Sequence, residues 1–263
     1  MAEALFRVEA LRVELPDMTR KPLFGPVPRL EILKGLDFEI PRGAVLGIVG
    51  GSGSGKTTLG RTLVRLMEPT AGRILFDGAD ITHLPDAAMR PLRQRIQMIF
   101  QDPMSSLNPR LTIGRIIAAP LNATSRDPRV AEALGHVGLP AEFVHRYPHE
   151  LSGGQRQRIG IARAIAMRPD FILADEIVSG LDVSSQAQVL NLLEGLVRDL
   201  GLTLAFISHD LSVIRRLCDR VIVMQTGRIV EEAPTEALFE DPQHDYTREL
   251  LDAIPTPDPT VRW

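Results

Sequence analysis

The chain has 263 residues, a formal net charge of −3 at pH 7 and 44% hydrophobic residues, which suits one large globular domain or two small ones. Because acidic and basic residues nearly balance, the chain has no basic field for binding a nucleic-acid backbone, and we expect no nucleic-acid partner. The single cysteine, Cys218, excludes an internal disulfide framework and a metal site built on cysteines of this chain. No apolar run approaches the roughly 20 residues that span a bilayer, so we expect any membrane role to be peripheral.

The first third of the chain predicts strands followed by a buried strand and a helix. Phe6–Leu15 alternates apolar and charged residues, which is typical of a strand with one solvated face. Prolines and glycines over residues 16–30 predict a loop, and Leu36–Ile40 predicts a short strand. Val45–Val49 is an apolar run between glycines, which indicates a strand buried on both faces, and a helical pattern begins after Gly55.

Strand and helix signals then alternate along much of the chain. Further strands are expected at Ile74–Phe76, Gln97–Phe100, Phe171–Ala174, Leu204–Ile207 and Val221–Met224. Helices are expected at Ile113–Leu121, Arg129–Val137, Gln155–Met167, Val183–Leu200 and Leu211–Leu217. This order predicts an α/β fold with a mostly parallel core sheet, into which the helices between residues 103 and 168 are inserted. From Pro234 a helical pattern runs through Leu251, and prolines 255, 257 and 259 then predict a loose tail.

A glycine-rich segment separates the buried strand from its helix. It consists of Gly50, Gly51, Ser52, Gly53, Ser54, Gly55, Lys56, Thr57 and Thr58, and its first eight residues match G-x-x-x-x-G-K-[ST]. Glycines let the backbone approach phosphate oxygens closely, and the following helix offers unpaired N–H groups at its positive end. Lys56 adds a positive charge, and the Thr57 hydroxyl can ligate Mg²⁺. We therefore expect a nucleoside triphosphate with Mg²⁺ as the ligand.

A second candidate site lies where the buried strand Phe171–Ala174 runs into two carboxylates. Ligands of open α/β sheets bind at the carboxyl ends of the strands. We expect Asp175 to hold Mg²⁺, directly or through water, and Glu176 to orient and deprotonate an attacking water.

A third motif, Leu151-Ser152-Gly153-Gly154-Gln155, opens a predicted helix in the insertion, with Ser152 placed to cap it. It is a second helix N-terminus suited to an anion. Because one chain already carries a triphosphate cradle, this site is useful if two subunits sandwich each nucleotide between them.

With these motifs the sequence resembles the ATP-binding subunits of ABC transporters, whose signature is similar to the third motif. The resemblance implies a P-loop NTPase fold with an antiparallel β subdomain and a helical subdomain over about residues 103–165. It identifies Gln101 as the glutamine that senses Mg²⁺ and the attacking water and links to the membrane partner. It likewise identifies Ser179–Asp182 as the D-loop of the family, and His209 as the switch histidine near the γ-phosphate. Taken alone, Gln101 could be a loop amide, and Asp182 and His209 could be helix-start residues.

Three longer segments resemble the dipeptide and oligopeptide importer branch of this family, which also includes nickel, opine and glutathione importers. They are Phe100–Pro109, Asp182–Leu190 and His244–Pro255, the last similar to that branch's C-terminal extension. The resemblance implies an ATPase domain over residues 1–233 and an extension over 234–263. It also implies a second ATPase subunit, identical or paralogous, two transmembrane permease subunits, an indirect link to an extracytoplasmic solute-binding protein, and a peripheral position on the cytoplasmic face of the plasma membrane. Two rival classes stay open: an ATPase serving a soluble enzyme complex, and a regulatory nucleotide-binding module without turnover.

Some positions depart from the family pattern. Ile177 and Asp245 stand where proline is usual, although neither carries a reacting group. No tyrosine precedes the phosphate loop, which leaves Phe24 as the candidate for adenine stacking or as a loop anchor. Some peptide-importer ATPases that resemble this chain carry a cysteine cluster in the extension, which is thought to hold an iron–sulfur centre. Because this chain has only Cys218, which is expected to pack on the helix Leu211–Leu217, no such centre is expected. The histidines at 83, 136, 145 and 149 lack metal-ligand spacing and are interpreted as surface residues.

Overall fold

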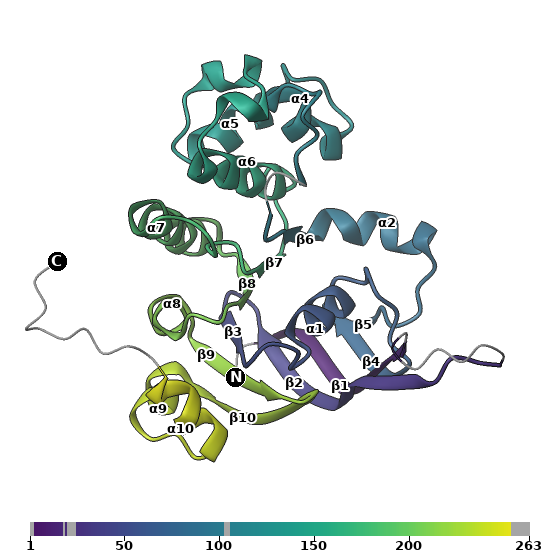
Figure 1. The fold of residues 1–263 in the computed structure, drawn as a ribbon. Helices are drawn as coiled ribbons and strands as arrows, with labels where there is room; N and C mark the ends of the chain where they lie inside the picture. Colours follow the sequence, from purple (N-terminus) through teal and green to yellow (C-terminus); the bar gives the residue numbers. More distant parts are fainter. Residues whose placement is uncertain (1–2, 18, 20–24, 103–105, 254–263) are drawn as a thin grey trace, which may run out of the picture.

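The computed structural model describes residues 3–17, 19, 25–102 and 106–253, and its strands form two sheets (Figure 1). The smaller sheet is antiparallel, in the order β2 (Arg29–Pro41), β1 (Ala4–Pro16), β4 (Ala71–Phe76) and β5 (Ala79–Asp80). The larger sheet has the order β10 (Arg228–Pro234), β9 (Arg220–Gln225), β3 (Val45–Val49), β8 (Thr203–Ile207), β7 (Phe171–Asp175) and β6 (Ile96–Ile99). Its neighbouring pairs from β9 to β6 are parallel, and β10 joins β9 as an antiparallel edge.

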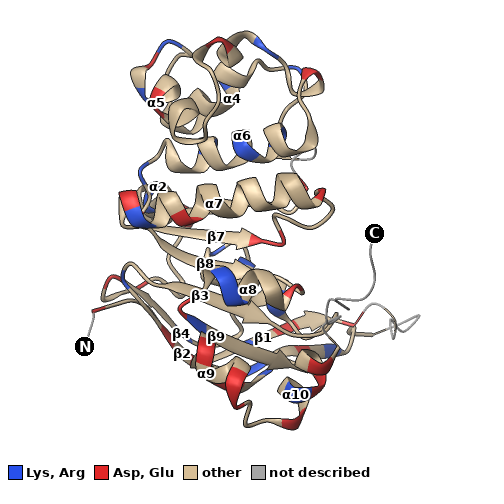
Figure 2. Ribbon diagram, turned by 90° about the vertical axis from the view of Figure 1, so that its left-hand side faces the viewer, with Lys and Arg blue, Asp and Glu red and all other residues tan. Residues whose placement is uncertain are grey.

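Helices cover the larger sheet and form a separate layer at one end of the molecule. They are α1 (Lys56–Leu63), α2 (Asp86–Arg95), α4 (Ile113–Ala118), α5 (Pro128–His136), α6 (Gly153–Ile165), α7 (Val183–Leu200), α8 (Leu211–Leu217), α9 (Thr235–Glu240) and α10 (Asp245–Asp252), with short 3₁₀ turns at Ala119–Leu121, Ala141–His145 and Pro148–Glu150. Figures 1 and 2 show α4, α5 and α6 in the layer farthest from the antiparallel sheet, with α7 between them and the core sheet. No helix in the described part of the chain combines the length and apolar character that a bilayer crossing needs.

Two hydrophobic cores lie on opposite faces of the larger sheet. In β3, Val45 and Val49 belong to the core that includes α6, α7 and α8. Leu46 and Ile48 belong to the other core, which the antiparallel sheet and α1 complete. Successive residues of a strand point to opposite faces, so a strand covered on both sides must be apolar throughout. This explains the uninterrupted apolar run at Val45–Val49.

The strands and helices depart from the sequence expectations in several places. β1 and β2 are longer than predicted because they pair from Pro16 and Arg29 inward, which shortens the loop predicted over residues 16–30. The helical pattern after Pro234 is two helices, α9 and α10, separated at residues 241–244. The strand β10 and the helix α2 were not predicted. The predicted proline-rich tail lies outside the described residues.

Candidate functional site

The order of the parallel strands brings four loops to one edge of the larger sheet. β3, β8, β7 and β6 are successive neighbours that run in the same direction. Their carboxyl ends therefore lie side by side, and each continues into one of the predicted motifs. The glycine-rich loop follows β3, His209 follows β8, Asp175 and Glu176 end β7, and Gln101 follows β6.

The glycine-rich loop has a backbone that requires glycine. Gly50 has φ +147° and Gly55 has φ +104°, in the region that other residues rarely adopt. A Cβ atom on Gly50 would stand 2.2 Å from the carbonyl oxygen of Met224. The loop backbone therefore packs closely against β9 at Met224. The helix α1 begins directly after Gly55, with its first N–H groups facing the loop.

Lys56 is folded back into this loop. Its Nζ atom donates hydrogen bonds to the carbonyl oxygens of Gly50, at 2.7 Å, and Gly51, at 2.9 Å. Burial lowers the pKa of Lys56, against the opposing effect of the Glu176 and Asp175 carboxylates. A hollow of about 320 Å³ opens beside it, lined by Ile32, Ser52, Gly53, Gly55, Lys56, Thr57, Thr58 and Glu176. A positive group at the floor of a loop rich in backbone donors is suited to an anion.

Asp175 is a buried carboxylate with an unused coordination position. Its side chain is 5% exposed, and its Oδ1 atom has no hydrogen-bond partner among the described residues. Burial, followed by the Glu176 charge, raises the pKa of Asp175, whereas Arg61, the Thr57 hydroxyl and Lys56 lower it. Buried polar atoms nearly always have partners, so an orphaned carboxylate oxygen fits a cation that binds with the substrate.

Glu176 is the point at which the other loops converge. The Gln101 side-chain amide donates a hydrogen bond to Glu176 Oε2 at 3.1 Å. His209 Nδ1 lies 3.7 Å from the same oxygen. Glu176 itself has φ +49°, a left-handed conformation that costs a residue with a side chain about 1 kcal/mol or more. Its backbone N–H donates to the Ile207 carbonyl at 3.0 Å, which holds this strained turn against the end of β8.

The signature segment forms its own structure away from the hollow. Ser152 caps α6 by accepting from the Gln155 N–H at 3.3 Å, and the Gln155 side chain accepts from the Ser152 N–H at 3.0 Å. A Cβ on Gly154 would lie 3.1 Å from the Ser185 hydroxyl, so the start of α6 packs closely against α7. Asp182 caps α7, accepting from Ser185 N at 2.9 Å. The structure therefore brings Gln101 and His209 to Glu176, which lines the hollow with the glycine-rich loop, and it places Asp175 beside Thr57 of that loop. Ser152–Gln155 and Asp182 do not line the hollow.

The remaining sequence expectations are met in part. Histidines 83, 136, 145 and 149 are exposed. Cys218 is buried beside Ile214, and both reach the position that a Cβ on Gly47 would occupy. Phe24 lies outside the described residues. Sequence reasoning missed Tyr246, whose hydroxyl accepts a hydrogen bond from the Gly51 N–H at 2.7 Å. No local signal points to this contact, because the two residues are 195 positions apart.

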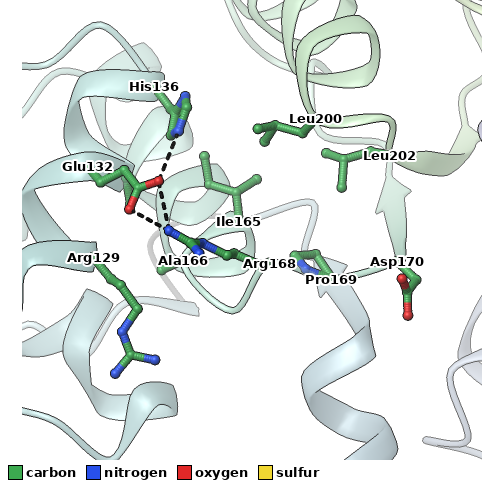
Figure 3. Close-up of a pocket in the computed structure, with 11 residues that line it drawn as sticks. Arg129, Glu132, His136, Ile165, Ala166, Arg168, Pro169, Asp170, Leu200 and Leu202 are labelled. Atoms are coloured by element: carbon green, nitrogen blue, oxygen red, sulfur yellow. Dashed lines mark hydrogen bonds and ion pairs between the residues drawn. The ribbon is translucent and has the colours of Figure 1, made fainter.

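A second hollow lies where β7 and β8 begin, at the opposite ends of these strands from the candidate site, and Figure 3 draws its lining residues. It has a volume of about 260 Å³, and Asp170 and Leu202, which line it, precede β7 and β8. Glu132 from α5 pairs there with Arg168 at 3.0 Å and lies 3.7 Å from His136. Glu132 and Arg168 pair within this hollow, whereas Arg129 and Asp170 pair with Asp127 and Arg95 outside its lining. None of the predicted site residues lines it.

Two protein-family models match the chain. The model described as "ABC transporter" matches residues 33–179. The model described as "Oligopeptide/dipeptide transporter, C-terminal region" matches residues 230–263.

Curated proteins of several bacteria are similar over most of the chain. The oligopeptide transport ATP-binding protein OppF of Bacillus subtilis is 52% identical over 233 residues, which are 85% of this chain and 76% of the relative. AppF, an oligopeptide transport ATP-binding protein of the same organism, is 51% identical over 233 residues, 86% of this chain and 71% of the relative. A protein of Sinorhizobium fredii named as a peptide ABC transporter ATP-binding protein is 48% identical over 265 residues, 98% of this chain and 75% of the relative.

Solved structures share the fold. A dimeric ATP-binding cassette, MJ0796, bound to ADP and phosphate, is 29% identical with a TM-score of 0.76 and covers 88% of this chain and 98% of its own. The protein cbiO1 of Clostridium perfringens, described as part of an ABC transporter complex, is 30% identical with a TM-score of 0.77 and covers 91% of this chain and 92% of its own. The predicted fold class is confirmed.

Proposed function

The chain belongs to the ABC transporter family, and from this premise we propose that it is the ATP-hydrolysing subunit that powers a peptide importer. The observation that carries the proposal is the convergence of Gln101 and His209 on Glu176, beside the phosphate loop. A hydrolase needs such a cluster, whereas a module that only binds nucleotide does not.

In the proposed reaction Glu176 acts as the general base. Its carboxylate accepts a proton from the water that attacks the γ-phosphate, a role worth typically 10²–10⁴ in rate. The Gln101 amide, 3.1 Å from Oε2, holds the carboxylate and is close enough to orient that water. His209 lies beside the same oxygen, where it can donate a hydrogen bond to the phosphate that leaves.

Nucleotide phosphates bind at the phosphate loop in this proposal. The α1 N-terminus and the loop N–H groups would hold the phosphate oxygens, and Lys56 would turn from the loop carbonyls to them. Mg²⁺, when bound, neutralises charge that develops on the phosphates. Asp175 would hold it through the unpartnered Oδ1, together with Thr57 and Gln101.

A second ATPase chain completes each site. Since Ser152, Gly153, Gly154 and Gln155 do not line the hollow of their own chain, we propose that they contact the nucleotide of a partner chain. The dimeric state of a similar cassette supports this arrangement. The partner is a second copy or a paralogue. Asp182 caps the N-terminus of α7, which packs against the start of α6 at Gly154, so Asp182 would lie close to that interface.

The match of residues 230–263 to the transporter C-terminal region supports transport over service to a soluble enzyme complex. We propose an ATPase domain over residues 1–233, with residues 103–165 as its helical subdomain, and an extension over 234–263. Two transmembrane permease subunits would couple to the segment after Gln101, which places the chain at the cytoplasmic face of the membrane. The solute-binding protein would act through the permease. Names of the relatives favour peptides as cargo over nickel, opines or glutathione.

The test is to isolate the tagged chain from its native membranes in mild detergent and to identify the proteins that accompany it by mass spectrometry. Two permease subunits are expected, together with a second ATPase if the dimer is mixed. Recovery of soluble enzymes without a permease would contradict the transport proposal and favour an ATPase that serves an enzyme complex.

A further inference from the structure

The C-terminal extension reaches the phosphate loop. The backbone N–H of Gly51 donates a hydrogen bond to the Tyr246 hydroxyl at 2.7 Å, and Tyr246 lies in the first turn of α10. A Cβ atom on Gly51 would stand 2.9 Å from the same hydroxyl oxygen. The glycine at this position thus allows a side chain from the extension to touch the loop backbone.

The contact falls on a peptide group that Lys56 also holds. The carbonyl oxygen of the Gly50–Gly51 peptide accepts from Lys56 Nζ at 2.7 Å, and the N–H of the same peptide donates to Tyr246. Glycine residues flank this peptide on both sides, so its rotation is less restricted than that of any other peptide type. Lys56 and Tyr246 therefore fix its orientation from opposite edges.

Tyr246 is itself held by a network that ties α10 to the edge strand β10. The Glu231 carboxylate accepts from the backbone N–H groups of Gln243, at 2.9 Å, and His244, at 3.0 Å, and from the Thr247 hydroxyl. Burial raises the pKa of Glu231, but these hydrogen bonds outweigh it and leave the pKa below its ordinary value. His244 Nδ1 accepts from the Tyr246 N–H at 3.1 Å and caps the helix.

The C-terminal end of α10 also lies near His209, one of the residues that converge on Glu176. Leu250 and Ala253 line a hollow of about 430 Å³ together with Gly50 and His209. Figure 2 shows that acidic residues gather around α9 and α10, although α10 also carries Arg248, and the contact with the loop uses an uncharged hydroxyl. The hydrogen bond between Gly51 and Tyr246 thus fixes the position of the extension relative to the phosphate loop.

We propose that Tyr246 is a positioning residue for nucleotide binding, which holds the Gly50–Gly51 peptide of the phosphate loop in its binding orientation. The inference rests on the proposed function, in which Lys56 turns to the phosphates. When Lys56 leaves the Gly50 carbonyl, the Tyr246 hydroxyl is the contact that still holds this peptide. Without it, the nucleotide must order the loop itself, and that ordering cost reduces affinity.

The test is the affinity of the purified full-length chain for ADP with Mg²⁺, because ADP binding involves neither hydrolysis nor closure of the dimer. Tyr246→Phe removes one hydroxyl and keeps the ring. A neutral hydrogen bond contributes enough to predict a loss of affinity of about 2- to 12-fold. The matched control is Tyr147→Phe, the same change at the other tyrosine of the chain, which is 39% exposed and stacks on His149. This control should bind ADP like the unmodified chain.

A second variant separates positioning from general stability. Glu231→Gln removes a charged acceptor from the network that holds α10, and it should weaken ADP binding through Tyr246. If Glu231 acts through Tyr246, the ADP affinity of the double variant Glu231→Gln/Tyr246→Phe should lie within about twofold of that of the weaker-binding single variant. Additive losses would show that Glu231 acts independently of Tyr246.

The outcomes distinguish this inference from the proposed function. If the unmodified chain fails to bind ADP, the proposed function is wrong. If it binds ADP and Tyr246→Phe binds equally well or more tightly, the Tyr246 inference is overturned while the proposed function stands. A lower melting temperature for Tyr246→Phe with unchanged ADP affinity would assign the contact a purely structural role and would also overturn the inference.

Discussion

Replacing Asp175 with asparagine should stabilise the chain without nucleotide while weakening the further stabilisation that Mg²⁺-nucleotide provides. The Asp175 carboxylate is 5% exposed, its Oδ1 has no partner among the described residues, and burial raises its pKa. A buried polar group left unpaired costs about 1–3 kcal/mol, and a charged one costs more. Asparagine has nearly the same shape and keeps a buried polar side chain, so the change relieves only the extra cost of the charge, and we expect the free energy of unfolding to rise by about 1 kcal/mol.

The assay is thermal unfolding of the purified chain at pH 7.5 with and without Mg²⁺-ADP. For a chain of this size 1 kcal/mol corresponds to a shift of about 2–4 °C. Asp175→Asn should therefore melt higher than the unmodified chain without ligand, yet gain less from Mg²⁺-ADP. The control is Asp199→Asn, an equal change of charge at a side chain that is 62% exposed, which should stay within about 0.5 kcal/mol.

The dependence on pH gives the sign of the effect independently. The native pKa of Asp175 lies above its unfolded value, so the native state takes up a proton at a higher pH than the unfolded chain. The loss of folding stability caused by the ionised Asp175 carboxylate is therefore complete at pH values above the raised native pKa. This loss becomes smaller as the pH falls through that native pKa. The stability gap between Asp175→Asn and the unmodified chain should narrow on acidification. A variant that is less stable without ligand, or a gap that widens, would refute the reasoning.

Three further measurements test other parts of the molecule. Glu176→Gln should reduce phosphate release at least ~10²-fold while ADP affinity is retained. Phosphate release is measured on the native membrane complex, and if its two ATPase chains differ, both carry the substitution. Near-normal turnover would rule out Glu176 as the general base. Ser152→Ala should lower the free energy of unfolding by about 1 kcal/mol through loss of the α6 cap, while Ser152→Asn keeps most of it; calorimetry that finds both variants equal would reject the cap. Burial raises the pKa of the Cys218 thiol, so a thiol reagent should label Cys218 in guanidinium but not in the native chain; rapid native labelling, followed by absorbance, would contradict this burial.

The sequence predicted elements with a clear hydrophobic pattern: the helices Val183–Leu200 and Leu211–Leu217 have the expected bounds, and strands buried on both faces were also found. Val45–Val49 and Phe171–Asp175 lie between two cores, and such strands must be apolar along their whole length. β10 was missed because Glu231 and Glu232 interrupt its pattern, and it forms by pairing with β9 across a tight turn. α2 was missed because it contains Pro91 and buries only Met89, which leaves a weak helical period.

The site shows the same division between local and long-range information. The phosphate loop and the Asp175–Glu176 pair could be predicted because the chemistry and the structural context are contiguous in sequence. Gln101 and His209 carry no such local signal, and the strand order in the sheet is what brings them to Glu176. The Tyr246 contact depends on how the extension packs against the loop, which no spacing or periodicity in the chain encodes.

The central claim is that the four loops at the sheet edge form one Mg²⁺-ATP site. Titration calorimetry of Mg²⁺-ATP into the Glu176→Gln chain, which suppresses turnover, tests it directly, with Lys56→Ala added as the comparison. We expect saturable binding of one nucleotide per chain, weakened about 10- to 100-fold by Lys56→Ala, since a hydrogen bond to a charged group is worth about 1.5–3 kcal/mol. No binding, or equal binding with and without Lys56, would contradict the claim.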